Sequence, residues 1–126
     1  MKTIIETDLE LVALGKLIAF VKYDCHDSDC LLFAGSPIIN GIYEKVIENR
    51  RKYYTDRGCV IPDEDEYSIE KNSMIADAVK RNIMMTKNWH ELSNEIKEEY
   101  VKDLIRPYYF KEETVKSLIK ERDIIN

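Results

Sequence analysis

The sequence predicts an all-α fold, with about five helices in one compact domain over residues 1–126. Three observations support this prediction. The chain has only four glycines and three prolines, about half the usual share of these two residue types. Apolar residues recur at helical spacing, and residues that start or stop helices stand at the ends of the periodic segments. The alternative is an α+β fold with a short hairpin within residues 16–34, because short apolar runs rich in Val, Ile and Phe are ambiguous.

The first helix is expected over residues 7–23, where Thr7 and Glu10 have the spacing of a capping box. Its apolar residues point in almost all directions, so we expect it at the centre of the bundle or partly in an oligomer interface. A homodimer through this helix is therefore one expected arrangement. The positions left for solvent are Glu10, Gly15, Lys16 and Lys22.

The second helix has the clearest start, because Ser36 suits the N-cap and Pro37 the first helical position. Gly58 is a typical C-terminal stop. We expect the next segment, residues 59–67, to be an exposed loop. Its acidic residues, Asp63, Glu64, Asp65 and Glu66, suit a basic groove on a partner protein.

Three further helices complete the prediction. Ser68 is expected to cap a helix that runs to about residue 85, and Ser93 to cap the next one. Pro107 should end that helix, because proline disfavours a helical conformation in the residue before it. The last helix is expected over residues 112–124.

The charge balance argues against some partners. The chain has 19 Lys and Arg against 24 Asp and Glu, a net charge of −5. Proteins that bind nucleic acid through phosphate contacts usually have a basic surplus, so we expect no nucleic-acid partner. The longest apolar stretch, residues 9–21, is interrupted by charges and is shorter than the roughly 20 residues that span a bilayer. With no signal-peptide pattern, the expected location is cytoplasmic, without membrane association.

The cysteine count is odd, and a chain of this size can build a core without disulfides. We therefore expect Cys25, Cys30 and Cys59 to be free thiols in a reducing compartment. Together with His90 they are the candidates for a zinc site, but structural zinc sites usually have two close ligand pairs and this chain has one. We expect ordinary cysteines and no cofactor. No nucleophile and base stand out as a pair, so we expect no catalytic residue and no enzymatic activity.

Arginines and tyrosines gather at two places. Arg50, Arg51, Tyr54 and Arg57 lie near the end of the second helix, where cations also stabilise the helix dipole. Arginine forks bind phosphates and carboxylates, and tyrosine rings offer stacking faces. The second group follows the fourth helix and consists of Arg106, Tyr108 and Tyr109.

Two functions follow from these features. The first is a small acidic regulatory protein that binds a partner protein, a build typical of inhibitors and accessory factors of phages and other mobile elements. The frequent Ile, Lys, Glu, Asn and Tyr suit an AT-rich bacterial or phage genome. The alternative is a binder of a small phosphorylated ligand, similar to a nucleotide, that uses the arginines and tyrosines.

Overall fold

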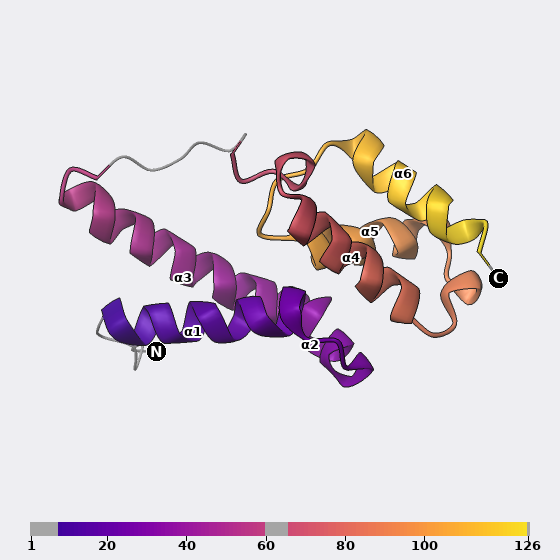
Figure 1. The fold of residues 1–126 in the computed structure, drawn as a ribbon, viewed down its shortest axis with the longest axis horizontal. Coiled ribbons are helices and arrows are strands. Elements are labelled where there is room, and N and C mark those ends of the chain that lie inside the picture. The colour runs from indigo at the N-terminus through magenta and orange to yellow at the C-terminus, as the bar shows by residue number, and fades with distance from the viewer. Residues whose placement is uncertain (1–7, 60–65, 126) are drawn as a thin grey trace.

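Figure 1 shows the computed structural model, which describes residues 8–59 and 66–125. This part of the chain contains six α-helices, four shorter helical turns and no strand, which confirms the predicted all-α fold. No helix in it combines the length and apolarity needed to cross a bilayer. The elements in chain order are α1 (Asp8–Ala19), η1 (Phe20–Asp24), η2 (Ser28–Cys30), α2 (Leu31–Ala34), α3 (Pro37–Asp56), η3 (Ile69–Lys71), α4 (Ser73–Met85), η4 (Trp89–Glu91), α5 (Asn94–Ile105) and α6 (Glu112–Asp123).

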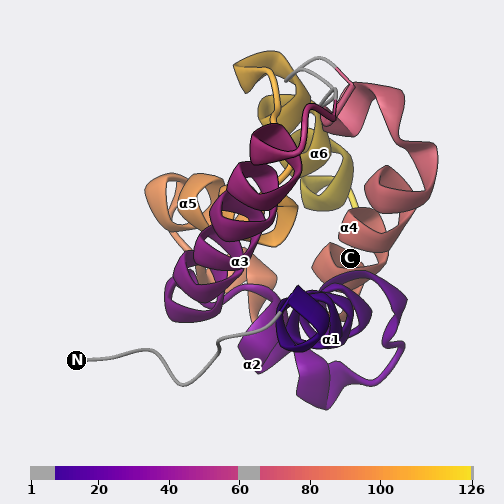
Figure 2. The same ribbon diagram turned by 90° about the vertical axis from the view of Figure 1, so that its left-hand side faces the viewer.

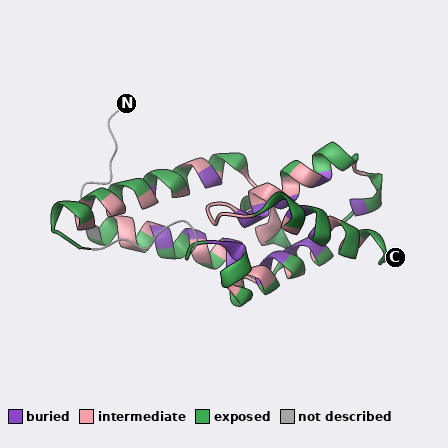
Figure 3. Cartoon of the chain, turned by 90° about the horizontal axis from the view of Figure 1, so that it is seen from above, coloured by how far each residue is buried: buried purple, intermediate pink, exposed green. Residues whose placement is uncertain are grey.

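The long helices form two groups. α1 and α3 lie side by side and extend away from the others, while α4, α5 and α6 pack against one another (Figure 1). The two groups meet at η1, a π-helical turn that packs against α2 and α4. Figure 2 views the molecule from the end of the α1–α3 pair. In Figure 3 the buried residues gather where helices face one another, so the core lies among α4–α6 and at their junction with η1.

Trp89 anchors this core. Its side chain is buried, and its Nε1 donates a hydrogen bond to Asp123 Oδ1 at 2.8 Å. Lys97 Nζ donates to the same oxygen at 2.9 Å, so η4 and α5 are both tied to the end of α6. Burying each large apolar side chain contributes about 1.5–3 kcal/mol. The other fully buried apolar residues include Ile69, Val79, Val101, Leu104, Ile105 and Val115.

Several predicted helix ends are confirmed. Ser36 Oγ accepts a hydrogen bond from the Ile39 N–H at 3.3 Å, and Ser93 Oγ accepts one from the Ile96 N–H at 3.2 Å. Gly58 has a φ of 75°, a conformation that favours glycine and ends α3. α5 ends at Ile105, as Pro107 predicts. The predicted cap Thr7 lies outside the described residues.

The predicted cap at Ser68 is wrong, because α4 begins at Ser73. The backbone around Ser68 instead pairs with the chain after α5. The Ile69 N–H donates to the Tyr109 carbonyl, and the Tyr109 N–H donates to the Tyr67 carbonyl, both at 2.9 Å. This pairing holds residues 67–69 in a bridge and a 3₁₀ turn, so the α-helix starts one turn later.

The alternative hairpin within residues 16–34 is also wrong, because this stretch is helical from α1 through α2 apart from a short turn. The expectation that Lys22 and Gly15 face solvent is wrong too. Gly15 is buried, and a Cβ on it would lie 3.4 Å from Val46 Cγ1, so the glycine permits close packing of α1 on α3.

Lys22 is fully buried in η1 and joins four elements. Its Nζ donates to the Ala34 carbonyl at 2.6 Å, to Asn40 Oδ1 at 2.7 Å and to the Asp103 carbonyl at 2.9 Å. These three bonds tie η1 to α2, α3 and α5, and they explain how a lysine is accommodated inside the fold. Burial lowers the pKa of Lys22 to about 7, against the opposing charge of Asp103, while Arg106 lowers it further.

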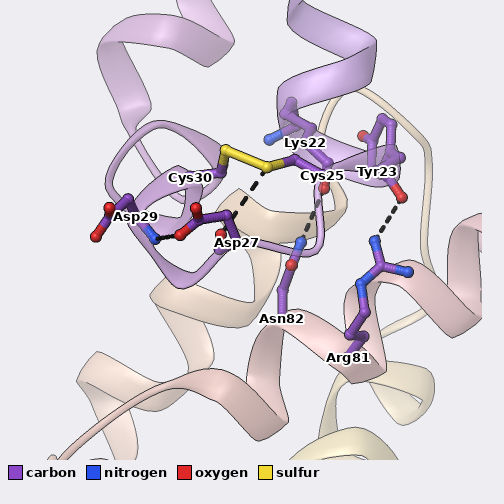
Figure 4. The surroundings of a disulfide bond; sticks show 8 residues. All are labelled: Lys22, Tyr23, Cys25, Asp27, Asp29, Cys30, Arg81 and Asn82. Atoms are coloured by element: carbon purple, nitrogen blue, oxygen red, sulfur yellow. Dashed lines mark hydrogen bonds between the residues drawn. A yellow bond between two sulfur atoms is a disulfide. The ribbon is translucent and has the colours of Figure 1, made fainter.

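Side chains of α4 donate hydrogen bonds to the backbone carbonyls at the end of η1. Asn82 Nδ2 donates to the Lys22 carbonyl at 2.8 Å, and Arg81 Nη2 donates to the Tyr23 carbonyl at 2.6 Å (Figure 4). η1 is thus held by its side chains and by its backbone.

A disulfide joins Cys25 to Cys30 (Figure 4), so the prediction of free thiols is wrong for these two residues. The cause is the turn between them. Asp27 Oδ1 accepts a hydrogen bond from the Asp29 N–H at 2.9 Å, and the Cys30 N–H donates to the Asp27 carbonyl at 3.0 Å. The turn brings the two Cα atoms within 6.6 Å. Cys59 is free and exposed.

Candidate functional site

A pocket of about 660 Å³ lies between the α1–α3 pair and the segments around Tyr67 and Tyr109. Its volume falls within the range of roughly 300–1,000 Å³ that is usual for ligand sites. Two types of side chain dominate its lining. Its tyrosines are Tyr43, Tyr54, Tyr67, Tyr108 and Tyr109, and its cations are Lys16, Arg50 and Arg51.

α3 supplies one wall of the pocket. Tyr43, Ile47, Arg50 and Tyr54 follow one another at intervals of four, three and four residues, so they lie on one face of the helix. The opposite wall is fixed by the backbone bonds of Tyr109 to Tyr67 and Ile69 described above. A continuous helix and a paired loop therefore hold the side chains that line the pocket.

Arg50 is the most constrained cation of the pocket. Its Nη2 donates to Tyr54 Oη at 3.3 Å, and its guanidinium lies 5.7 Å from the centre of the Tyr54 ring. Its Nε is buried and has no hydrogen-bond partner among the described residues, and the same holds for Arg81 and Arg122. Arg51 lies 5.9 Å from the centre of the Tyr67 ring.

The tyrosines of the pocket pack against one another and against the core. Burial and the nearby Tyr108 raise the pKa of Tyr43 to about 12, against the opposing effect of Arg50. Burial also raises the pKa of Tyr108, and Tyr67 adds to this rise. The Tyr23 ring meets the Tyr108 ring edge to face, with centroids 5.6 Å apart. At neutral pH both Tyr43 and Tyr108 are therefore neutral hydroxyl groups that can donate hydrogen bonds.

The described lining residues of the pocket have a slight positive balance in an acidic protein. Among them are three cations and two carboxylates, Glu44 and Glu48. The arrangement offers charge-assisted hydrogen bonds to an anion and ring faces to an aromatic or apolar group.

The structure thus brings together five of the residues predicted from the sequence: Arg50, Arg51, Tyr54, Tyr108 and Tyr109. Arg57 and Arg106 do not line the pocket, and their side chains contact other residues. Arg57 stacks on Tyr53 at 3.5 Å and donates to its carbonyl, whereas Arg106 donates to Asp103 Oδ1 at 2.8 Å.

The predicted acidic loop is only partly described. Asp63, Glu64 and Asp65 lie outside the described residues, and Glu66 is exposed.

The candidate metal ligands do not meet in the described part of the chain. Cys25 and Cys30 are joined to each other, so neither is available as a thiolate. His90 Nε2 lies 2.9 Å from the Ile125 carbonyl oxygen. Cys59 follows the end of α3, at the opposite end of the molecule from η4 (Figure 1). No group of three or more His, Cys, Asp or Glu residues within residues 8–59 and 66–125 has the arrangement to hold a metal ion.

The sequence did not predict Lys16, Tyr43 and Tyr67 as lining residues. The spacing of Tyr43 from Arg50 is a local signal that places both on one helix face. Lys16 and Tyr67 are brought in by tertiary contacts, which no local pattern shows.

Comparisons with known proteins cover the whole chain. No protein-family model, curated protein or solved structure matches it. The candidate function is therefore argued from the geometry of the pocket.

Proposed function

We propose that this protein binds a small phosphorylated ligand with an aromatic ring, such as a nucleotide, in the pocket beside α3. The gathering of Arg50 and Arg51 with tyrosine rings around one pocket is the observation that carries the proposal. The pocket has a volume of about 660 Å³. An anion is the group that suits these two guanidinium groups best, because charge-assisted bonds are about twice as strong as neutral ones.

Each type of side chain has a role in this proposal. Arg50 and Arg51 bind the phosphate, and a hydroxyl such as that of Tyr43 donates a further hydrogen bond to it. The rings of Tyr67 and Tyr109 offer flat faces for an aromatic base. Since Glu44 and Glu48 offset two of the three cations, the pocket suits a ligand with few phosphates.

Thermal unfolding with a panel of ATP, ADP, AMP, adenosine and inorganic phosphate tests the proposal. A ligand at 100 times its Kd raises the free energy of unfolding by about 2.7 kcal/mol. We expect stabilisation by at least one nucleotide, and binding weakened about 10- to 100-fold by Arg51→Gln, from the loss of a bond worth about 1.5–3 kcal/mol. Arg57→Gln, directly after the end of the same helix, is the matched control and should bind as the wild type does. The proposal would be contradicted if no compound of the panel stabilised the protein, or if both variants lost the same amount of binding affinity.

The second candidate is a cytoplasmic regulatory protein of the phage-inhibitor type that binds a partner protein. Exposed large apolar side chains favour it, because such patches often mark interaction sites. Many of them lie on η1, α2 and the start of α3, namely Phe20, Leu32, Phe33, Ile38 and Ile42. A partner recovered from a bacterial lysate in fixed ratio should be lost with Leu32→Glu and retained with Met74→Glu, a change on exposed α4. Retention by both variants would contradict this role for the surface.

The proposed cytoplasmic location conflicts with one feature of the structure. Disulfides persist mainly in oxidising compartments. The Cys25–Cys30 bond therefore favours such a compartment over the cytoplasm.

A further inference from the structure

The Cys25–Cys30 disulfide closes a short turn at the surface, directly after η1. Residues 26–29 are exposed and both cysteines are partly exposed, so a dissolved thiol can reach the bond. The N–H groups of Asp29 and Cys30 both donate to Asp27, inside the turn. These hydrogen bonds hold the two cysteines near each other without the disulfide, so the bond can re-form within the chain after it is broken.

The disulfide joins the end of η1 to the start of α2. Cys25 is the residue directly after η1, and its N–H donates to the Phe20 carbonyl at 2.8 Å, which completes the π-helical turn. Cys30 directly precedes α2. The end of α2 is held separately, because Lys22 Nζ donates to the Ala34 carbonyl at 2.6 Å. Opening the disulfide therefore releases the start of α2 and the residue that completes η1.

η1 is the element that can respond to this release. π-Helical turns are rare, and they occur mostly as single turns, frequently at functional sites. In Figure 4, side chains from α4 hold the carbonyls of Lys22 and Tyr23, whereas the disulfide holds the residue at the end of the turn. The bonds from α4 do not involve the cysteines. Reduction should therefore leave the protein folded and change the end of η1.

η1 also borders the candidate pocket. Ala19, the residue directly before η1, lines the pocket, and so does Tyr108. The Tyr23 ring of η1 meets the Tyr108 ring edge to face, with centroids 5.6 Å apart. The Tyr23 hydroxyl donates a shared hydrogen bond to the carbonyls of Ile105 and Arg106, at 3.0 and 2.9 Å. A change in η1 thus reaches the pocket wall at Tyr108 through direct contacts.

We propose that the Cys25–Cys30 disulfide is a reversible redox switch that sets the ligand affinity of the pocket through η1. The reductant is a dithiol. One of its thiolates attacks a sulfur of the disulfide and the S–S bond breaks, after which its second thiol resolves the mixed disulfide. Two electrons and two protons pass to Cys25 and Cys30, and the dithiol leaves as a disulfide. The inference rests on the proposed function for its ligand.

The reduced protein has the lower ligand affinity in this proposal. Once the end of η1 is released, only part of the population keeps Tyr108 in the position that lines the pocket, and the apparent affinity falls with that fraction. The switch also removes the conflict between the disulfide and the proposed cytoplasmic location, because cytosolic disulfides are usually transient or redox-sensing.

NMR spectra of the ligand-free protein with labelled tyrosines test the movement of the pocket wall. The protein has a Cys59→Ser background, in which Cys25 and Cys30 are the remaining cysteines. We expect dithiothreitol to shift the ring signals of Tyr23 and Tyr108, and oxidised glutathione to restore them. The Tyr53 ring, which stacks on Arg57 and does not line the pocket, should keep its signal. A Tyr108 signal that does not respond to reduction would overturn the proposal, as would loss of the folded circular dichroism spectrum on reduction.

Calorimetric titration with AMP in the same background tests the control of the pocket. We expect reduction to weaken AMP binding about tenfold, within the range of roughly 5- to 150-fold that is usual for coupling between sites. Adding Cys25→Ser and Cys30→Ser should give the affinity of the reduced protein, with no response to dithiothreitol. Ser28→Ala, at an exposed residue between the cysteines, keeps the disulfide and is the matched control, so it should keep the full redox response.

The two experiments separate this proposal from the proposed function. If AMP binds equally in both redox states, the proposed function stands and the switch is overturned. If no nucleotide binds in either state while the Tyr108 signal still follows reduction, the proposed function fails and the redox-driven change of the pocket wall is supported.

Discussion

Replacement of Lys22 by methionine should change how stability depends on pH. In the folded protein the pKa of Lys22 is about 7, mainly because burial disfavours its charge. In the unfolded chain this pKa returns to the ordinary value of about 10.4. Between these two values the unfolded state binds more protons than the folded state, so the stability of the wild type rises with pH.

The size of this effect follows from the two pKa values. The slope reaches at most about 1.4 kcal/mol per pH unit, and the gain between pH 6 and pH 9 amounts to about 2 to 3 kcal/mol. Asp103 and Arg106 are the charged groups that act on Lys22, and they have opposing effects. Above pH 10 the tyrosines reverse the trend. The raised pKa of Tyr43 stabilises the fold fully below the unfolded-state pKa, and this contribution is lost as the pH rises towards the folded-state value of about 12.

Lys22→Met removes this pH dependence and also leaves acceptors without donors. The Asp103 carbonyl keeps a bond from Asn40 Nδ2 at 2.9 Å, but the Ala34 carbonyl and Asn40 Oδ1 lose the bond from Lys22. Each such loss costs about 1–3 kcal/mol. The variant should therefore be less stable than the wild type at pH 9, and the difference should shrink towards pH 6, where the wild type must bury a charge.

Urea denaturation at pH 6, 7, 8 and 9 measures these values. The fluorescence of Trp89, the single and fully buried tryptophan, reports unfolding. Lys16→Met, at an exposed lysine of the preceding helix α1, is the control and should keep the wild-type slope. The reasoning is refuted by a wild type whose stability is flat or falls from pH 6 to pH 9. It is equally refuted by a Lys22→Met variant that keeps the slope.

Three further predictions rest on other contacts. Gly35→Ala would place a Cβ 2.7 Å from a ring carbon of Tyr100, and it should lower the free energy of unfolding, measured by urea denaturation, by about 1–3 kcal/mol. Gly41 lies inside α3 with open space around it, so Gly41→Ala should raise the free energy of unfolding by up to about 1 kcal/mol. Hydrogen bonds from a lysine and from the buried tryptophan lower the pKa of Asp123, so the wild type should lose stability as the pH falls through that lowered value. Acid titration of Asp123→Asn should show a smaller loss, and an identical loss would contradict the assignment. Alkylation without reductant should modify only Cys59, as mass spectrometry would show, and modification of three cysteines would disprove the disulfide.

Local signals in the sequence predicted the fold class and most helix ends. Ser36, Ser93 and Gly58 act through hydrogen bonds or dihedral angles within a few residues, so a single sequence reveals them. The predicted helix cap at Ser68 was wrong because this segment pairs with Tyr109, far along the chain. No local pattern reports such a contact.

The burial of Lys22 is hidden for the same reason, whereas the Cys25–Cys30 disulfide depends on the local turn at Asp27. The burial of Lys22 depends on three acceptors, from α2, α3 and α5, that surround its Nζ. Arg50 and Tyr54 of the pocket could be predicted because they lie close together on one helix, whereas their proximity to Tyr109 depends on the tertiary fold.

Ligand binding in the pocket is the central claim, and an NMR titration with tyrosine-labelled protein tests it most directly. On addition of a stabilising nucleotide, we expect the ring signals of Tyr54, Tyr67 and Tyr109 to shift together. The hydroxyl groups of Tyr100 and Thr86 form a hydrogen bond of 2.8 Å, and neither residue lines the pocket. The signal of Tyr100 should therefore stay in place. Unchanged pocket signals at saturating nucleotide, or shifts confined to Tyr100, would contradict the claim.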